Sequence, residues 1–277
     1  MSKNSKKYVR NLQFHIFESI QSTIEMKITF LGTGTSQGVP VIACPCEVCR
    51  EGTRKDKRLR SSILVELDNL TFVIDAGPDF RYQMLRQDVE SLDAILVTHC
   101  HKDHIAGLDD VRSYNYLQKK PMDVYASKRD QRAIKQEFSY AFSNNNYPGL
   151  PSINLLDVKN EIIIDNVHVD VLPVLHLKME VYGYRIGDFA YITDTNYIPG
   201  STMSNLLDCK VIVLNALRKQ EHVSHYNLEK AIEVLEFLRP EKAYLTHISH
   251  FMGFHEEVQK ELPDFIELAY DGLTFEL

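Results

Sequence analysis

The sequence predicts a mixed α/β fold in which two β-sheets pack back to back and helices cover their outer faces. Three observations support this fold class. Predicted strands and helices follow one another along most of the chain. Several strands, such as 94–98 and 210–215, are continuous apolar runs, which is typical of strands buried on both faces. Strands followed by helices recur in both halves, as a rough duplication without a short-period repeat.

The predicted strands begin after Met26 and end at turn or loop residues. Asp68-Asn69 and Gly187-Asp188 have the composition of hairpin turns. In chain order the strands are 27–31, 62–67, 71–75, 94–98, 122–126, 161–164, 167–172, 181–186, 189–193, 210–215, 243–246 and 273–276.

The predicted helices lie between these strands. Asp79 stands at the N-cap position of the first helix, and Pro240 follows the end of the fourth. The helices are 80–87, 105–117, 129–142, 228–238 and 256–262. A Gly-rich turn (32–38) precedes a long loop with a cysteine cluster and a basic run, and residues 143–158 read as a second long loop.

Composition excludes several classes of protein. The 277 residues are 44% hydrophobic and 25% charged, the ordinary globular mix, so the chain is neither disordered nor collagen-like. The net charge of −7 provides no general attraction for nucleic acid. No apolar run reaches the ~18 residues that a membrane span needs. We therefore expect neither a membrane nor a nucleic-acid partner.

Residues 1–25 form a predicted N-terminal extension with no signal-peptide core, and we therefore expect a cytoplasmic protein. The extension is either a disordered tail or a weak amphipathic helix between Leu12 and Ile20. Either Met1 or Met26 is the start of translation, and the sequence leaves both open. Residues 26–277 are predicted to form a single domain.

A dense group of metal-ligand residues follows the strand 94–98. It reads Thr98-His99-Cys100-His101-Lys102-Asp103-His104. Side chains two residues apart in extended backbone point the same way, so His99 and His101 can hold one ion. Asp103 and His104 come after the turn and suit a second ion. Imidazole with carboxylate suits Zn, Mn or Fe.

One loop cannot surround two metal ions, so further ligands are needed. Candidates stand where later strands emerge, which is where sheet-based folds place their sites. His176 follows the strand 167–172, Asp194 ends 189–193 and His247 ends 243–246.

This ordered set of ligand residues resembles that of the metallo-β-lactamase-fold hydrolases, over about residues 26–277. The resemblance implies a four-layer αββα sandwich with a binuclear site at one sheet edge. By this analogy His99, His101 and His176 hold one metal, and Asp103, His104 and His247 hold the other. Asp194 bridges them. Asp75 resembles a turn residue near the family site, where it would act through other residues or support the turn.

Three cysteines, Cys44, Cys46 and Cys49, lie close together in the long loop. Structural zinc needs four ligands, and His250, three residues past His247, is the favoured fourth. Three free thiols, or a ligand from Cys100 or Cys209, are the alternatives. We do not expect a redox role, since no Cys-x-x-Cys is seen at a helix start in a thioredoxin-like unit. This cysteine run with His247-x-x-His250 is similar to the PhnP-like branch, which is named after a phosphoribosyl cyclic phosphate phosphodiesterase.

The resemblance and the ligand set together predict a metal-dependent hydrolase, namely a phosphodiesterase acting on a small or cyclic phosphate ester. Two metals ~3.5–4 Å apart can bind a hydroxide nucleophile and hold phosphoryl oxygens. His225 matches a histidine that assists catalysis in PhnP-like proteins and tRNase Z, with His222 as the alternative. We assign catalytic roles to His225 and Asp103. Arg58, Arg60 or Arg112 could contact phosphate, although a solvated charge run explains each one better.

Other functions remain open. They are a tRNA 3′-processing endonuclease, a thioester or lactam hydrolase, and a non-catalytic metal protein like PqqB. Residues 143–158 contain no basic run to hold tRNA, and all seven ligand positions are present. The expected cofactors are two divalent metals (Zn, Mn or Fe) and one structural Zn. Family members are often dimers, so a homodimer is compatible with the resemblance.

Overall fold

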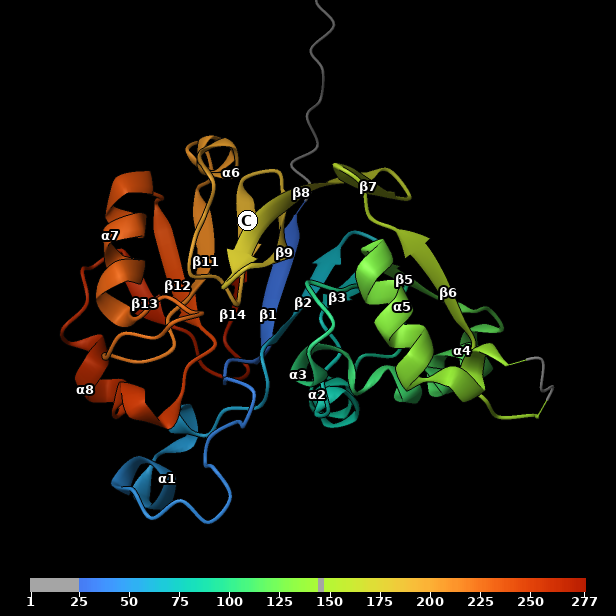
Figure 1. The fold of residues 1–277 in the computed structure, drawn as a ribbon, viewed down its shortest axis with the longest axis horizontal. Helices are drawn as coiled ribbons and strands as arrows, with labels where there is room; N and C mark the ends of the chain where they lie inside the picture. The colour runs from blue at the N-terminus through green and yellow to red at the C-terminus, as the bar shows by residue number, and fades with distance from the viewer. Residues whose placement is uncertain (1–24, 144–146) are drawn as a thin grey trace, which may run out of the picture.

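Two seven-stranded sheets form the centre of the computed structural model, which describes residues 25–143 and 147–277 (Figure 1). The predicted extension lies outside this range apart from Glu25. In spatial order the first sheet contains β14 (Thr274–Glu276), β1 (Met26–Gly32), β2 (Ser62–Leu67), β3 (Leu70–Ile74), β4 (Ala94–Leu96), β5 (Met122–Ala126) and β6 (Ile153–Asp157). The second contains β13 (Ile266–Leu268), β12 (Lys242–Thr246), β11 (Val211–Asn215), β10 (Phe189–Ile192), β9 (Met179–Ile186), β8 (Val167–His176) and β7 (Glu161–Ile164).

The two sheets repeat one pairing pattern. In the first, β1, β2 and β3 pair antiparallel, and β3 to β6 then pair parallel. In the second, β7 to β10 pair antiparallel, and β10 to β13 pair parallel. The rough duplication in the sequence is therefore a repeat of the sheet topology.

Helices cover the outer face of each sheet. Those on the first sheet are α2 (Phe80–Arg86), α4 (Arg112–Gln118) and α5 (Lys128–Glu137), and those on the second are α6 (Gly200–Leu206), α7 (Leu228–Leu238) and α8 (His255–Gln259). Two short helices, α1 (Glu47–Glu51) and α3 (Lys102–Ile105), lie in loops. The 3₁₀ helices are Arg54–Asp56, Leu108–Val111, Ser139–Phe142 and His250–Met252. The predicted αββα sandwich is confirmed.

Apolar side chains between the sheets hold the sandwich together. Phe30 and Phe72 from the first sheet pack in one cluster with Tyr184, Phe189 and Tyr191 from the second, and all five are fully buried. Burying side chains of this size is the main favourable contribution to folding. Separate clusters lie between each sheet and its own helices.

The prediction of residues 143–158 as a loop was wrong in its last part, which forms β6. This strand is at the edge of its sheet, paired only with β5, and its residues are at least partly exposed. An edge strand has one strand neighbour, so its apolar pattern is weak. Strand β13 and helices α1 and α6 were also missed, and each is at most seven residues long.

The predicted helix 105–117 is interrupted. Helix α3 ends at Ile105, and α4 begins only at Arg112. At Gly107, an added Cβ would lie 2.1 Å from the Gly77 carbonyl oxygen. The chain therefore passes too close to the β3–α2 loop for a side chain there.

The predicted N-cap position of Asp79 is confirmed. Asp79 stands at the N-cap position of α2, but its side chain makes no bond to the helix. Its carboxylate instead accepts hydrogen bonds from the Arg60 backbone N–H and guanidinium.

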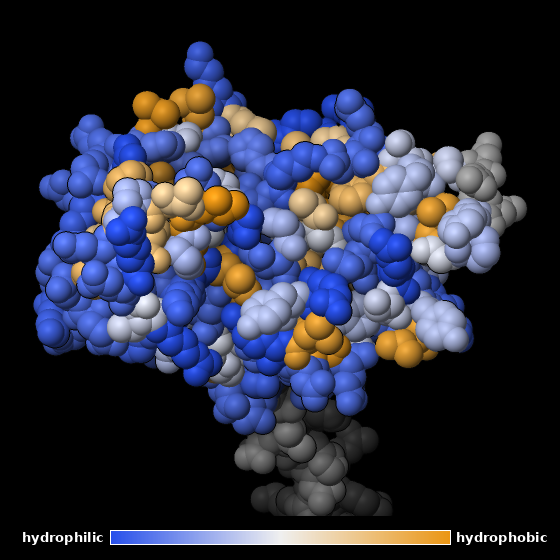
Figure 2. Space-filling model, turned by 90° about the horizontal axis from the view of Figure 1, so that it is seen from below, coloured by the Kyte–Doolittle hydropathy of each residue, from blue (hydrophilic) through white to orange (hydrophobic). Residues whose placement is uncertain are grey.

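The visible surface is largely hydrophilic. At the end that carries α1, α2 and α8, apolar residues form small separate groups (Figure 2). Within residues 25–143 and 147–277, no helix combines the length and apolarity needed to cross a membrane.

The inter-sheet core predicts a clear difference between two phenylalanines. Phe72→Ala should lower the free energy of unfolding by about 3–5 kcal/mol, because it removes buried surface and leaves a cavity. Phe237 on α7 is 64% exposed, so Phe237→Ala should change it by no more than about 0.5 kcal/mol. Urea denaturation followed by circular dichroism measures both. Equal losses would contradict the assignment of Phe72 to the core.

Candidate metal centre

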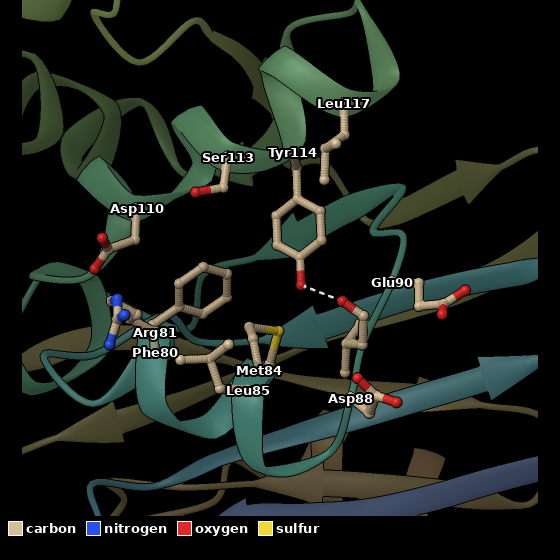
Figure 3. A pocket seen from close by; sticks show the side chains of 11 residues that line it. Phe80, Arg81, Met84, Leu85, Asp88, Glu90, Asp110, Ser113, Tyr114 and Leu117 are labelled. Atoms are coloured by element: carbon tan, nitrogen blue, oxygen red, sulfur yellow. Dashed lines mark hydrogen bonds between the residues drawn. The ribbon is translucent and has the colours of Figure 1, made fainter.

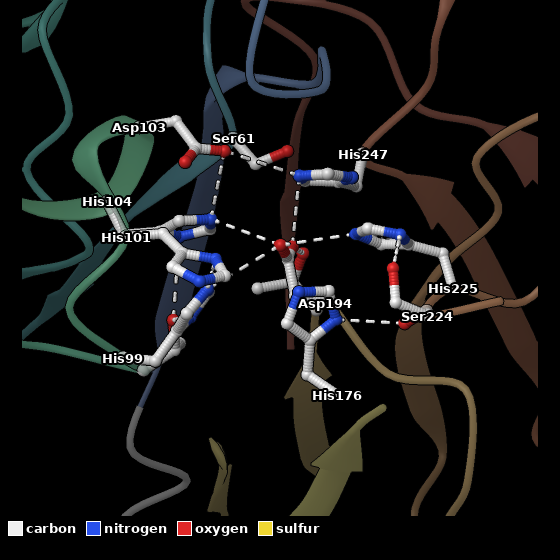
Figure 4. Close-up of polar contacts among 12 residues, drawn as sticks. Ser61, His99, His101, Asp103, His104, His176, Asp194, Ser224, His225 and His247 are labelled. Atoms are coloured by element: carbon white, nitrogen blue, oxygen red, sulfur yellow. Dashed lines mark hydrogen bonds and ion pairs between the residues drawn. The ribbon is translucent and has the colours of Figure 1, made fainter. Parts of the chain in front are cut away.

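The carboxyl ends of four strands meet at one edge of the sandwich and carry the candidate ligands (Figure 4). His99 and His101 follow β4 of the first sheet, and His176 is the last residue of β8. Asp194 and His247 follow β10 and β12. The site therefore takes residues from both sheets and depends on how they pack.

A first group of ligand atoms comes from His99, His101, His176 and Asp194, and these atoms lie within 4.8 Å of one another. His99 Nε2 is 3.0 Å from His101 Nδ1 and 3.7 Å from Asp194 Oδ2. This is the set that the sequence predicted for one metal.

A second group comes from Asp103, His104, His247 and again Asp194, within the same limit of 4.8 Å. His104 Nε2 is 3.3 Å from Asp103 Oδ2, and His247 Nε2 is 3.0 Å from Asp194 Oδ1. Asp194 belongs to both groups, at the position predicted for a bridging carboxylate.

The donor atoms fit divalent metal ions. Among the described residues, His104 Nε2 and His247 Nε2 are buried and have no hydrogen-bond partner, although carboxylate oxygens lie nearby. Buried polar atoms are normally paired, so nitrogens that converge on carboxylates without hydrogen-bond geometry indicate a missing partner. An imidazole and carboxylate donor set suits Zn, Mn or Fe.

Neighbouring groups orient two of the imidazoles. Asp75 Oδ2 lies 2.7 Å from His104 Nδ1, and the same carboxylate accepts bonds from the backbone N–H and hydroxyl of Thr98. His176 Nδ1 donates to the carbonyl oxygen of Ser224 at 2.8 Å. A proton held on Nδ1 leaves Nε2 free to bind a metal. Asp75 therefore acts through His104, as the sequence analysis allowed.

Burial and charge set the protonation states. Burial alone would raise the pKa of Asp194, but the charges of His247 and His104 outweigh it and hold that pKa well below its ordinary value. Burial lowers the pKa of His99 well below that of a free imidazole. Burial would lower the pKa of His104, but the charges of the nearby carboxylates, Asp103 first, raise it well above its ordinary value, so His104 must release a proton to bind a metal.

His225 lies beside Asp194 and His247, and His222 contacts the ring nitrogen of His225 that faces away from Asp194. His225 Nε2 is 3.4 Å from Asp194 Oδ2, and its ring stacks on His247 at a centroid distance of 5.0 Å. His222 contacts His225 through Nδ1 at 3.1 Å. Of the two candidates, His225 has the better position to reach a substrate.

The cysteine cluster forms a separate group with His250, whose ligand atoms also lie within 4.8 Å of one another. His250 Nδ1 is 3.3 Å from Cys44 Sγ and 3.2 Å from Cys46 Sγ. The hydrogen bond with His250 lowers the pKa of Cys46 to about 6, and burial raises that of Cys49 to about 11. A thiolate beside an imidazole suits zinc.

The other two cysteines lie elsewhere. Cys209 is buried in the cluster between the second sheet and its helices, and Cys100 lies beside Asp130. Neither belongs to the four-residue group. Cys46 is the N-cap of α1, so a Cys-x-x-Cys does begin a helix here, although outside a thioredoxin-like unit.

The candidate arginines are all engaged within the protein. Arg58 is buried and donates to Thr33 Oγ1 and to the Ala269 carbonyl oxygen, so it is not part of a solvated run either. Arg60 pairs with Asp79, and Arg112 pairs with Asp109. Nothing in these contacts supports phosphate binding.

A cavity of about 280 Å³ lies between α2 and α4, away from the metal-ligand groups (Figure 3). Phe80, Met84 and Tyr114 line it, and Tyr114 donates a hydrogen bond to the Val89 carbonyl oxygen at 2.8 Å. None of its lining residues is a candidate ligand.

Comparison with known proteins agrees with this geometry. Residues 71–248 match the model of the Beta-lactamase superfamily domain. A solved structure described as a new diphosphatase from the PhnP family is 38% identical, with a TM-score of 0.86. The alignment covers 92% of this chain and 98% of that one.

Two curated relatives are named after other activities. The octanoyltransferase of Porphyromonas gingivalis is 38% identical over 252 residues, which are 90% of this chain and 51% of that protein. The ribonuclease Z of Methanococcus maripaludis is 28% identical over 160 residues, which are 54% of this chain and 46% of that protein. The chain thus spans about half the length of the curated relatives it matches.

The shared position of Asp194 predicts that Asp194→Ala weakens both metal positions and abolishes turnover. Metal affinity should fall by more than about tenfold, because even groups that only orient a ligand contribute about 10–100-fold. Mass spectrometry of bound metal after dialysis measures this. Asp165→Ala, at an exposed turn, is the control and should keep its metal. Full metal content in Asp194→Ala would remove Asp194 from the bridging position.

The cysteine group predicts that Cys46→Ser loses one equivalent of zinc per chain and melts at a lower temperature, while the active-site ligands stay in place. Cys209→Ala, at a cysteine outside the group, should keep its zinc. Zinc content and thermal denaturation measure both variants. Unchanged zinc in Cys46→Ser would contradict a structural site.

Proposed function

The chain belongs to the beta-lactamase superfamily and, within it, to the PhnP family, and from this premise we propose that it is a metal-dependent phosphodiesterase. Its substrate is a small or cyclic phosphate ester, hydrolysed with the help of two divalent ions. The observation that carries the proposal is the carboxylate of Asp194, which two ligand groups share and which lies 3.4 Å from His225 Nε2.

The candidate ligands have three separate roles. One set (His99, His101 and His176) would hold one ion, and another (Asp103, His104 and His247) would hold the second. Asp194 would bind both and fix their separation. When bound, two such ions (Zn, Mn or Fe) lower the pKa of water and polarise phosphoryl oxygens.

His225 would act on the leaving group. Charge develops on the leaving oxygen as the P–O bond breaks, and a histidine can donate a proton there. The Nε2 atom of His225 faces the ligand groups, and its Nδ1 atom faces away from them toward His222 and Ser224. Nε2 would therefore contact the substrate, and the contacts of Nδ1 would hold the ring in place.

The cysteine group would hold a structural zinc. Its fourth ligand, His250, lies three residues after the candidate active-site ligand His247. A zinc there would fasten the loop that contains Cys44, Cys46 and Cys49 to the loop that follows β12.

Hydrolysis of a diphosphate bond is a second candidate, favoured by the PhnP-family diphosphatase that is 38% identical over almost its whole length. The chemistry is again cleavage of a P–O bond, so the same residues would serve. RNA processing has less support, since the chain is acidic and residues 143–158 contain no lysine or arginine to hold RNA. Octanoyl transfer is the activity in the name of a relative that is about twice as long as this chain.

A substrate panel after loading with Zn or Mn tests the proposal. It contains bis(p-nitrophenyl) phosphate, cyclic nucleotides, cyclic ribose phosphates, a diphosphate diester, precursor tRNA and a thioester. We expect turnover of the small phosphodiesters. Cleavage of the diphosphate diester alone would select the second candidate, and hydrolysis of the thioester alone would overturn both.

His225→Gln should lower kcat by about 10²–10⁴-fold, the usual contribution of general acid–base catalysis. Metal content should stay unchanged, because the two ligand groups do not include His225. His168→Gln, at an exposed histidine paired with Glu161, is the matched control and should keep full activity. A fully active His225→Gln would remove His225 from the reaction.

A further inference from the structure

A cavity of about 230 Å³ lies beside His225. His225 forms part of its wall, and the Nε2 atom of the same residue is 3.4 Å from Asp194 Oδ2 (Figure 4). None of the lining residues belongs to a metal-ligand group, so metal ions held by those groups would leave the cavity free. Its lining consists of Asn196, Glu221, His222, His225, Tyr226, Asn227 and Lys230.

Asn196 ties the wall of this cavity to the site. Its Oδ1 atom accepts from the Leu177 N–H at 2.7 Å, and its Nδ2 atom donates to the Val223 carbonyl oxygen at 3.2 Å. Leu177 directly follows the candidate ligand His176, and Val223 lies two residues before His225. The side chain therefore connects the end of β8 to the loop before α7. A cavity held by such bonds is already formed before a ligand arrives, as small-molecule sites usually are.

The start of α7 forms another part of the wall, and its polar groups are engaged within the protein. Asn227 accepts from the Lys230 N–H at 3.0 Å and donates to the Lys219 carbonyl oxygen at 3.1 Å. The ammonium group of Lys230 pairs with the carboxylate of Glu233. The positive charge at the cavity is therefore balanced by a neighbour.

Glu221 carries the charge at the cavity that has no such neighbour. Its backbone carbonyl oxygen accepts from Arg218 at 2.8 Å, but its carboxylate has no hydrogen bond or ion pair with the described part of the chain. A carboxylate accepts hydrogen bonds and repels other anions. A hydroxyl group is therefore a suitable partner for Glu221, and a second phosphate group is not.

The size of the cavity limits what it can hold. Pockets that enclose a drug-sized ligand measure roughly 300–1,000 Å³, so a cavity of about 230 Å³ accepts only part of such a molecule. The phosphate group of an ester would lie at the metal-ligand groups, outside the cavity. The space therefore suits the alcohol part of an ester, with the size of a small polyol or a single sugar.

We propose that this cavity is the subsite for the alcohol part of the phosphate ester, and that Glu221 selects an alcohol with a free hydroxyl group and no negative charge. The inference rests on the proposed function, in which His225 acts on the leaving oxygen, so that the leaving alcohol lies beside His225. It narrows the substrate class to phosphate esters of small polyols or sugars. Glu221 determines specificity and takes no part in breaking the P–O bond.

The test compares two cyclic esters that differ in one hydroxyl group, glycerol 1,2-cyclic phosphate and propane-1,2-diol cyclic phosphate. The value of kcat/KM for each ester is measured with the zinc-loaded full chain, and the ratio of the two values gives the preference for the hydroxyl group. Glu221→Ala removes the carboxylate. Glu229→Ala is the matched control, because Glu229 is an exposed residue of α7 that does not line the cavity.

We expect the wild type to prefer the glycerol ester by about tenfold, which corresponds to one hydrogen bond to a charged group. The ratio should fall to near one in Glu221→Ala and stay at the wild-type value in Glu229→Ala. Equal kcat/KM values for the two esters in the wild type would overturn the subsite and leave the proposed function intact. An unchanged preference in Glu221→Ala would also overturn it.

A binding measurement separates this inference from the proposed function. Calorimetry with the same samples compares the affinities of the ring-opened products, glycerol 1-phosphate and propane-1,2-diol 1-phosphate. Hydrolysis of neither ester by the wild type would reject the proposed function. The subsite would then be supported by about tenfold tighter binding of glycerol 1-phosphate that is lost in Glu221→Ala, and equal affinities in the wild type would overturn it too.

Discussion

The buried carboxylate of Asp194 is the constraint on which the site depends. Only 2% of the residue is exposed, and removing an ionised group from water costs several kcal/mol unless it is paired. Imidazole nitrogens of His104, His225 and His247 surround it, all within 3.4 Å, and metal ions held by the two ligand groups would balance its charge. The three histidines follow different strands of the two sheets, so they surround this carboxylate only when the two sheets are packed together. Folding and assembly of the site are therefore one event.

The strand ends that carry the site depart from regular backbone. Asp75, Asp194 and His247 all have left-handed φ values, between 55° and 66°. For residues other than glycine such a conformation costs roughly 1–3 kcal/mol each, and it persists only where the surroundings enforce it. Here they do so through the Asp75 N–H bond to the Leu96 carbonyl oxygen and the contacts of the Asp194 carboxylate. The packing energy of the two sheets thus offsets the cost of these strained backbone conformations. The same conformations direct the ligand side chains toward one point.

Features whose residues lie close together in the sequence were the easiest to predict. The run from His99 to His104 was recognisable because its ligands are nearly contiguous. Asp194 was found because it stands where an apolar strand emerges and completes the ligand set that this run begins. Ser224 was missed, because its contact to His176 spans 48 positions and uses a backbone oxygen that no residue type announces. Strand β6 was missed for a different reason: an edge strand is only weakly patterned. The sequence therefore predicted the ligand residues well and the backbone contacts that orient them poorly.

The two candidate metal centres share one loop, which carries His247 at one end and His250 at the other. The backbone around Ile248, between His247 and His250, bonds to Thr33 at 2.8 Å and to Thr35 at 3.1 Å in the Gly-rich turn. That turn is held in its place by Asp271, which accepts from the Thr33 N–H at 3.0 Å. At Gly34 an added Cβ would lie 2.9 Å from the Leu59 carbonyl oxygen, so the turn leaves no room for a side chain. His247 directly follows β12, and His250 contacts Cys44 and Cys46, so both ends of this short loop are held. The cysteine group therefore holds one end of a loop whose other end carries a candidate active-site ligand.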